Sequence, residues 1–400
     1  IMTMRRLVGL VIVLWALSYA PRAETHGEKS QEPFLRLRTI MWYDVQWSTD
    51  RIRVGEEMTI TGKFHLFEEW PVRVVPPPSE AWVNVSVPGP QLLRKATYLN
   101  GVPLVSTVGL ELGRDYEFKL VLQGRRPGSY HLHPMVNVQG GGPIVGPGQW
   151  VTVEGDASSF SNPVTTLTGE TIDLETYGLG RVVGWHLMTI VLAIAWLGFW
   201  LVPRPFLGRL LLVEKGAEDE LISDRDRRVG WAFLIVAVLL VVGGYYTTNA
   251  VYPVTVPLQS ARVTVPPLEQ PPRLVEATVE RATYAVTTRT FTMDVRVTNK
   301  GNQPVRLGEL TTANIRFLNP ALFPTAEHRL VVEPADPINP GETKTIRAIA
   351  ADAVWETERL TMAYDPENRF AALLMFFDTE GGRRIIAVSG GPVIPKYRGT

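Results

Sequence analysis

The chain has 400 residues, and its 40 lysines and arginines balance 40 aspartates and glutamates, so no net charge favours binding to nucleic acid. It contains no cysteine, which excludes disulfide bonds, iron–sulfur clusters, cysteine-based zinc sites and blue-copper centres. Its length allows two or three domains. The 34 glycines and 31 prolines, in a chain rich in valine and threonine, are typical of β-structure with many turns.

Residues 1–25 have the features of a secretory signal peptide, with a basic start and an apolar run over residues 7–20. Cleavage after Thr25 makes His26 the first residue of the exported chain. Its free amine and its imidazole then become available to a metal together. A cut after Ala23 is the alternative, and it removes the amine ligand from His26.

Residues 26–176 are predicted to form a first β-sandwich, because short alternating segments are separated by turns. The alternation is clearest over residues 52–63, 82–87 and 116–122. A glycine-rich segment, residues 140–148, has too much glycine and proline for a regular element. It is expected to form an ordered loop that approaches the two histidines described next.

Two of the six histidines, His131 and His133, lie in one predicted strand and are called the histidine pair below. Side chains at positions i and i+2 of a strand leave the same face of the sheet, so the two imidazoles are expected side by side. Adjacent imidazoles chelate borderline metals such as copper or zinc. With the amine and imidazole of His26, they form a candidate set of four nitrogen ligands.

Residues 180–250 are predicted to form a transmembrane hairpin, with helices at about 182–202 and 229–248. The core of each run lacks charged residues and is long enough to cross a bilayer, and aromatic residues lie towards the ends. The loop at 203–228 carries six lysines and arginines, which places it in the cytoplasm by the positive-inside rule. Two buried core helices are the alternative.

Residues 262–400 are predicted to form a second sandwich. Its expected strands lie within residues 291–299, 305–317 and 343–350, and a short helix is expected within 352–362. His328 is expected in a solvated loop, and no metal-ligand spacing is visible in this part of the sequence. The predicted fold class is therefore mainly β, with two sandwiches joined by two transmembrane helices.

Several segments resemble the B subunit of the copper membrane monooxygenases, the family of particulate methane monooxygenase and ammonia monooxygenase. The resemblance spans nearly the whole exported chain and is carried by residues 26–31, 38–44, 126–133, 137–143, 167–173 and 391–395.

The resemblance implies two periplasmic cupredoxin-like domains on a bacterial inner or intracytoplasmic membrane. It implies assembly with two membrane-embedded partner subunits, A and C, as a trimer of heterotrimers. It assigns copper to the amine and imidazole of His26 with His131 and His133, the same set that spacing indicated. The implied reaction inserts one oxygen atom from dioxygen into a small apolar substrate or ammonia, and no catalytic residue is identified in this chain.

The sequence departs from some methane-oxidising relatives, because Met41 stands where they have a histidine of a second copper site. The partner of that histidine matches His65. We expect this second site to be absent and His65 to be a half-exposed strand residue. His186, at the start of the first apolar run, is either functional or an interfacial histidine bonded to a backbone carbonyl or to a partner subunit. Glu28 and Gln139 are candidates for orienting imidazoles.

The choice of substrate divides between methane and ammonia. Residues 32–34 resemble ammonia oxidisers, whereas residues 44–48, 148–150, 224–228 and 390–396 resemble methane oxidisers and favour methane. A non-catalytic, membrane-anchored copper-binding protein remains an alternative, since the same ligands serve both roles. A zinc enzyme is disfavoured, because it needs a general base near an open metal position and no acidic residue lies in the strand of the histidine pair.

Overall fold

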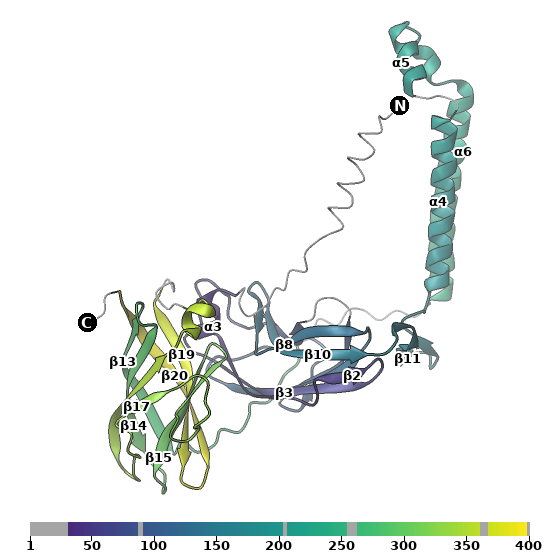
Figure 1. Cartoon of the computed structure of the whole chain (residues 1–400). Coiled ribbons are helices and arrows are strands. Elements are labelled where there is room, and N and C mark those ends of the chain that lie inside the picture. The colour runs from purple at the N-terminus through teal and green to yellow at the C-terminus, as the bar shows by residue number, and fades with distance from the viewer. Residues whose placement is uncertain (1–30, 87–90, 203–205, 254–261, 361–366, 398–400) are drawn as a thin grey trace. The chain divides into compact units, whose positions relative to one another are not determined.

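The computed structural model describes residues 31–86, 91–202, 206–253, 262–360 and 367–397 (Figure 1). Its contacts divide the chain into two compact units, of which Ser161–Gln259 form one and the residues before and after them form the other. The larger unit contains two β-sandwiches, and the smaller contains two long helices. The prediction of a mainly β chain with two apolar helices is confirmed.

The first sandwich packs a sheet of strand order β1-β3-β7-β5-β6 against a sheet of order β2-β10-β8-β4. Alternate residues of β7 are buried, so Phe118, Leu120 and Leu122 face the core while their neighbours face outward. The chain turns at Gly55, which has φ of 87°. The elements are β1 (Ile40–Trp47), β2 (Arg51–Arg53), β3 (Glu57–Leu66), β4 (Ala81–Ser86), β5 (Leu92–Leu99), β6 (Val102–Pro103), β7 (Asp115–Gly124), β8 (Gly128–Val138), β9 (Gly142–Val145), β10 (Gln149–Glu154) and the 3₁₀ helix η1 (Ala157–Ser159).

The glycine-rich segment was expected to lack regular structure, and this prediction is wrong for residues 142–145. These residues form β9, which pairs antiparallel with β8. Gly140 and Gly142 have φ of 75° and 82°, a conformation that lets the chain reverse directly after β8. Ile144 and Val145 are then buried, at 2% and 4% exposure, so pairing and burial offset the low strand propensity of glycine.

The second sandwich is a continuous path of eight strands in the order β16-β15-β19-β20-β13-β14-β18-β17. Strand β20 pairs antiparallel with β19 up to Pro392 and then parallel with β13 from Val393 onward, so it passes from one sheet into the other. The elements are β13 (Val275–Ala285), β14 (Thr290–Asn299), β15 (Val305–Thr312), β16 (Ile315–Leu318), β17 (Val331–Glu333), β18 (Thr343–Ala351), α7 (Val354–Thr357), β19 (Arg369–Asp378) and β20 (Arg383–Lys396).

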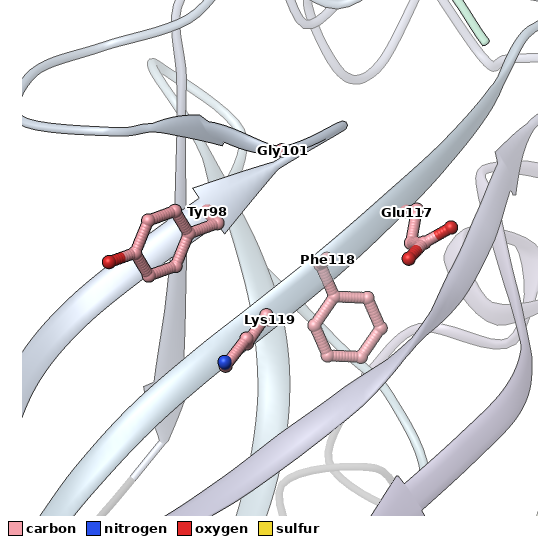
Figure 2. A pocket seen from close by; sticks show the side chains of 5 residues that line it. All are labelled: Tyr98, Gly101, Glu117, Phe118 and Lys119. Atoms are coloured by element: carbon pink, nitrogen blue, oxygen red, sulfur yellow. The ribbon is translucent and has the colours of Figure 1, made fainter.

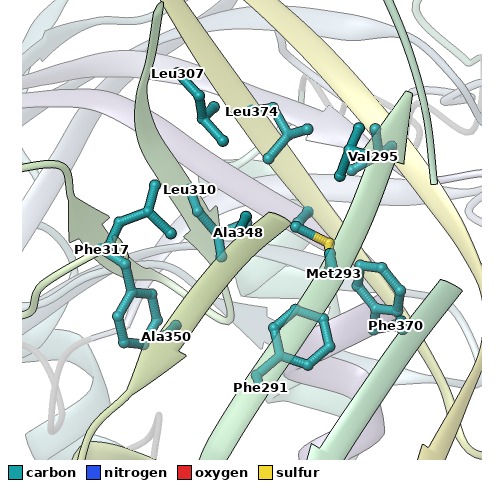
Figure 3. Packing of buried hydrophobic residues seen from close by; sticks show 14 of the residues in the cluster. Phe291, Met293, Val295, Leu307, Leu310, Phe317, Ala348, Ala350, Phe370 and Leu374 are labelled. Atoms are coloured by element: carbon teal, nitrogen blue, oxygen red, sulfur yellow. The ribbon is translucent and has the colours of Figure 1, made fainter. Parts of the chain in front are cut away.

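The core of the second sandwich is filled by apolar side chains from both of its sheets (Figure 3). Phe291 and Met293 of β14 pack with Leu310 of β15 and Phe317 of β16, and all four are fully buried. The expected helix within 352–362 is the single turn α7, whose Trp355 belongs to the same core. Residues 361–366 lie outside the described part of the chain.

The two sandwiches are held together by α3 (Pro33–Arg38) and β1. Leu37 of α3 is buried in the core of the second sandwich. The next strand alternates between two environments: Trp42 faces the core of the first sandwich, whereas Met41 and Tyr43 pack against Leu373 of β19. This explains why the first four residues of β1 are all buried.

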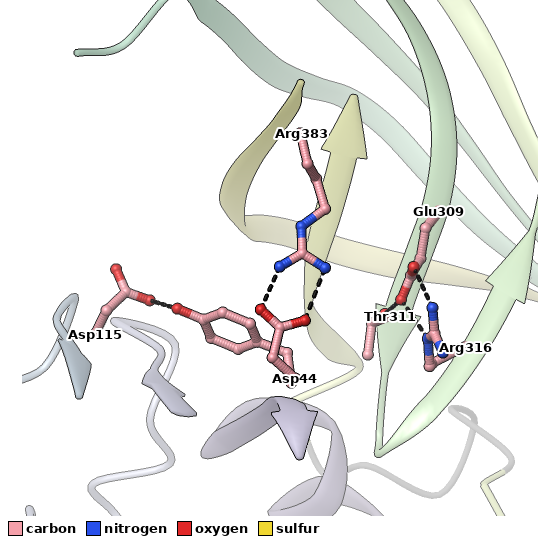
Figure 4. Close-up of polar contacts among 7 residues, drawn as sticks. Asp44, Asp115, Glu309, Thr311, Arg316 and Arg383 are labelled. Atoms are coloured by element: carbon pink, nitrogen blue, oxygen red, sulfur yellow. Dashed lines mark hydrogen bonds and ion pairs between the residues drawn. The ribbon is translucent and has the colours of Figure 1, made fainter. Parts of the chain in front are cut away.

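Polar contacts border this apolar interface (Figure 4). Arg383 of β20 donates hydrogen bonds from its two terminal guanidinium nitrogens to the carboxylate of Asp44, a residue with φ of 52°. Beside it, Glu309 is 1% exposed and accepts hydrogen bonds from Arg316 at 2.7 and 2.8 Å and from Thr311 at 2.7 Å. These three donors offset part of the cost of burying the Glu309 charge.

The smaller unit contains two helices long and apolar enough to cross a membrane, α4 (Leu179–Leu201) and α6 (Asp224–Val251). The apolar window of each helix has no buried residue within the described structure, which argues against the alternative of two buried core helices. Helix α6 begins before the predicted residue 229, because Ser223 and Asp226 form a reciprocal capping box. The loop predicted at 203–228 contains α5 (Phe206–Glu214) and the 3₁₀ helix η2 (Glu218–Leu221), and β11 (Pro163–Thr165) pairs with β12 (Thr171–Asp173) ahead of α4.

Candidate metal centre

The histidine pair lies on one face of β8, as its spacing predicted. The two imidazole centroids are 4.5 Å apart, and the ring planes are nearly perpendicular at 85°. Atom Nε2 of His133 lies 3.1 Å from Nδ1 of His131. Two ligands bound to one ion at about 2.0–2.1 Å and at right angles are separated by about 2.8–3.0 Å. The observed separation therefore fits two nitrogen ligands in adjacent positions around one metal.

His133 is oriented by the backbone of the glycine-rich segment. Its Nδ1 atom is 2.8 Å from the carbonyl oxygen of Gly146, and its side chain is buried, with 2% of the residue exposed. A carbonyl only accepts hydrogen bonds, so Nδ1 carries the proton and Nε2, the nitrogen that faces His131, carries the lone pair. Metal-binding histidines commonly have this arrangement, in which the other ring nitrogen donates to a carbonyl or carboxylate.

Two residues of the β9–β10 region pack directly on the imidazoles. A Cβ atom on Gly148 would lie 2.7 Å from Cε1 and 2.8 Å from Nε2 of His131, so only glycine fits here. Trp150 of β10 is paired with His131 in the ladder, and its ring centroid lies 5.0 Å from that imidazole at a tilt of 33°. The predicted approach of the glycine-rich segment to the histidine pair is thus confirmed.

The same segment is anchored by residues that the sequence analysis did not single out. The Gln31 side chain donates to Pro143 O at 2.5 Å and accepts from Val145 N at 3.4 Å. From the second sandwich, Asn314 donates to Val145 O at 3.1 Å. Gln139, the residue expected to orient an imidazole, is exposed. Long-range bonds from side chains to backbone carbonyls leave no residue pattern, so no signal pointed to Gln31 or Asn314.

The third predicted ligand, His26, lies outside the described residues, as do the signal peptide and Glu28. Over the ranges that the structure describes, no group of three or more His, Cys, Asp or Glu side chains is placed to hold a metal ion. The structure thus brings together His131 and His133 and leaves His26 a prediction.

The remaining histidines have other surroundings. His65 is 6% exposed, so the prediction of a half-exposed residue is wrong, because the second sandwich covers this face of β1 and β3. His328 was expected to be solvated, but its side chain is only 26% exposed and its Nδ1 is 2.9 Å from Asp352 Oδ2. His186 is bonded through Nδ1 to the Val182 carbonyl at 2.7 Å, as one of the two predictions for it stated.

His65 belongs to a small polar cluster beneath the interface. Its Nδ1 is 3.1 Å from Asp115 Oδ1, which also accepts from the Tyr43 hydroxyl at 3.0 Å. Burial acts to raise the pKa of Asp115, but hydrogen bonds from His65 and Tyr43 and the nearby imidazole lower it below the ordinary 3.8. Burial, followed by the Asp115 charge, raises the pKa of Tyr43, which stays protonated.

A separate surface pocket of about 200 Å³ lies on β5 and β7, in the sheet opposite the histidine pair (Figure 2). The Lys119 ammonium there is 5.9 Å from the centre of the Tyr98 ring, a cation–π distance. The pocket has no histidine and no converging set of polar groups among its described residues, so it adds nothing to the metal centre. Its lining residues are Tyr98, Gly101, Glu117, Phe118 and Lys119.

Comparison with known proteins gives matches over nearly the whole chain. Residues 27–397 match the sequence model of the monooxygenase B subunit protein family. The chain is 46% identical to the particulate methane monooxygenase alpha subunit of Methylococcus capsulatus (strain Bath) over 402 positions, covering 98% of this chain and 97% of that protein.

Solved structures give weaker likenesses. One is the cupredoxin domain of amoB from Nitrosocaldus yellowstonii, at 20% identity and a TM-score of 0.25, covering 30% of this chain and 91% of that one. Another is a protein of unknown function from Porphyromonas gingivalis W83, at 13% identity and a TM-score of 0.19, covering 88% and 100%. The family assignment rests on the two full-length sequence matches. The chain belongs to the family of monooxygenase B subunits.

Proposed function

We propose that this chain is the copper-binding B subunit of a membrane-bound copper monooxygenase that converts methane to methanol with one oxygen atom from dioxygen. The observation that carries the proposal is the histidine pair, with two ring nitrogens 3.1 Å apart and His133 oriented by a backbone carbonyl. Membership in the family of monooxygenase B subunits supports it, and the name of the Methylococcus capsulatus relative favours methane.

The proposed ligands are the imidazoles of His131 and His133 and the amine and imidazole of His26. Gln31 supports the inclusion of His26, because it ties the chain to the segment that carries Gly146. His26 precedes Gln31 by five positions, a length of chain that reaches at most about 18 Å. Nitrogen ligands suit copper in both of its common oxidation states.

The residues of this chain prepare the site in three ways. The Gly146 carbonyl keeps the proton of His133 on Nδ1, so Nε2 is the atom that would bind a metal. Gly148 admits both rings at close range, and Trp150 covers one face of His131. Copper, when bound, supplies the redox chemistry with dioxygen. We propose that this chain binds copper and organises the complex, and that the substrate reacts in a partner subunit.

The proposed location is a bacterial inner or intracytoplasmic membrane, crossed by α4 and α6. Two apolar helices that are exposed along their length support this placement. We propose that the domains at residues 26–176 and 262–400 are cupredoxin-like and lie in the periplasm, after removal of residues 1–25. The proposed partners are the membrane-embedded A and C subunits, in a trimer of heterotrimers.

A double variant, His131→Ala with His133→Ala, tests copper binding in the purified complex, with His328→Ala as a control for loss of a histidine elsewhere. The double variant is expected to lose the copper of this site, as measured by metal analysis and electron paramagnetic resonance, and to retain methane turnover. Unchanged copper in the double variant contradicts the ligand assignment. Loss of turnover in a complex that is still assembled contradicts the proposal that the substrate reacts elsewhere.

Three further measurements separate the proposal from its alternatives. N-terminal sequencing of the purified chain is expected to start at His26, and a start at Glu24 removes the amine ligand. Parallel assays with methane and ammonia decide the substrate. Purification without multi-span partners favours a membrane-anchored copper carrier over a component of a monooxygenase.

A further inference from the structure

The second sandwich reaches the histidine site through the turn between β15 and β16. Ala313 and Asn314 form this two-residue turn with φ of 50° and 64°, a conformation that asparagine tolerates well. Arg36 restrains the turn, because it donates to the Ala313 carbonyl at 3.5 Å and is itself only 4% exposed. The backbone that carries the Asn314 side chain is therefore restrained.

The Asn314 side chain hydrogen-bonds to the peptide group between Val145 and Gly146. Its Nδ2 donates at 3.1 Å to the carbonyl oxygen of Val145, which belongs to the same planar unit as the amide of Gly146. That Gly146 amide donates at 2.7 Å to the carbonyl of Pro134, the residue after His133. The peptide plane between Val145 and Gly146 is thus held at both ends.

The orientation of this plane sets where the next carbonyl points. The Gly146 carbonyl is the acceptor for Nδ1 of His133, 2.8 Å away. The Gly146 carbonyl is set relative to this plane by rotation about the bonds at the Gly146 Cα, so a tilt of the plane that those bonds do not compensate shifts the acceptor that holds the imidazole. Gly146 lacks a side chain to resist such a tilt, so the bond from Asn314 adds a restraint to the one that the Gly146 amide makes with Pro134.

We infer that Asn314 is a positioning residue for His133, so that the second sandwich completes a metal site whose imidazoles lie on the first. The proposed restraint of the Gly146 carbonyl by Asn314 does not depend on a bound metal. Its consequence for copper rests on the proposed function.

The test uses the purified full complex with two variants. Asn314→Gly removes the side chain and keeps a residue that tolerates the positive φ, and Asn314→Asp keeps the shape and removes the donor. The matched control is Asn100→Gly, because Asn100 also has a positive φ of 48° and donates to a backbone carbonyl, that of Pro266, at 2.9 Å.

The first measurement is made on copper-free complex. Hydrogen–deuterium exchange of the peptide covering residues 143–148 is expected to speed up by about five- to tenfold in the Asn314 variants, the effect of losing one hydrogen bond. Carbethoxylation of His133 is expected to rise relative to that of His328. The inference is overturned if a folded Asn314 variant shows wild-type rates of both exchange and carbethoxylation. It is also overturned if Asn100→Gly changes these two rates as much as the Asn314 variants do.

The second measurement adds copper. The Asn314 variants are expected to bind Cu(II) about tenfold more weakly, with altered hyperfine splitting in the electron paramagnetic resonance spectrum. Faster exchange combined with a wild-type spectrum and affinity overturns the positioning role. Wild-type complex that binds no copper at this site contradicts the proposed function, and the copper-free measurement then decides the mechanical link alone.

Discussion

Gly148 lies so close to His133 that a Cβ atom built on this glycine would be 2.4 Å from Cε1 of the imidazole. No rearrangement of a flexible side-chain end relieves such a contact, because the imidazole is buried and bonded to Gly146.

Gly148→Ala is therefore expected to displace both imidazoles and to weaken copper binding by about 10- to 100-fold. Copper affinity of the purified complex, measured by competition with a chelator, checks this. Gly391→Ala is the matched control, since nothing lies within 4 Å of a Cβ at that position. Equal copper affinity in the two variants would show that the glycine is not a steric requirement.

Gln31→Ala is expected to weaken copper binding about tenfold, because it releases the start of the described chain from Pro143 and Val145. The control is Gln139→Ala, an exposed position that is expected to leave copper affinity unchanged. A stronger effect at Gln139 than at Gln31 would restore the orienting role predicted for Gln139 from the sequence. Copper titration of both complexes provides the measurement.

Trp150 offers a spectroscopic check, because its indole is in contact range of His131. Cu(II) quenches nearby indole fluorescence, so addition of Cu(II) to copper-free complex is expected to lower the tryptophan emission. In Trp150→Phe the quenched fraction is expected to fall sharply. The control is Trp82→Phe, another partly exposed tryptophan of the first sandwich. Quenching that persists in Trp150→Phe places the bound copper away from His131.

The polar cluster of Asp115, His65 and Tyr43 predicts acid sensitivity. The folded-state pKa of Asp115 is lower than its unfolded value of 3.8, so its ionised form stabilises the fold above that pH. This contribution is lost as the pH falls below 3.8 and through the folded pKa. Asp115→Asn is expected to unfold at lower temperature than wild type at pH 7, with the difference shrinking as the pH falls below 3.8.

The raised pKa of Tyr43 predicts that the fold also loses stability at alkaline pH. Its contribution is present below the unfolded value of 10.0 and is lost as the pH rises past it, because the unfolded chain loses the hydroxyl proton first. Tyr43→Phe is expected to retain more of its neutral-pH stability at about pH 10.5 than wild type does. Thermal unfolding of the detergent-solubilised complex at acid and alkaline pH measures both effects. Unfolding temperatures of variant and wild type that change in parallel with pH contradict the predictions.

The sequence was sufficient for features that depend on local periodicity. His131 and His133 share a face because strand geometry has a period of two, and the helices follow from long apolar runs. The sequence was insufficient where distant segments meet. Asn314 and the carbonyl it holds are 169 positions apart, and the bond involves a backbone atom that every residue has.

Two expectations that the structure contradicts, for His65 and for residues 142–145, were wrong for the same reason. His65 was expected to be half-exposed because the strand pattern describes one sandwich, whereas the outer face of β1 and β3 is covered by the second. Residues 142–145 were expected to be irregular because of their glycine and proline, but pairing with β8 decides their conformation. Tertiary context determined both positions, and composition describes only local preference.

Leu37 is an early residue in the chain, yet it packs in a core formed by strands that begin at Val275. During biosynthesis a ribosome therefore makes this leucine long before its neighbours exist, and the hydrophobic centre of the last-made half stays incomplete until the two ends of the polypeptide meet. Leu37 and the helix α3 that carries it therefore cannot take up their final packing until these strands have been made.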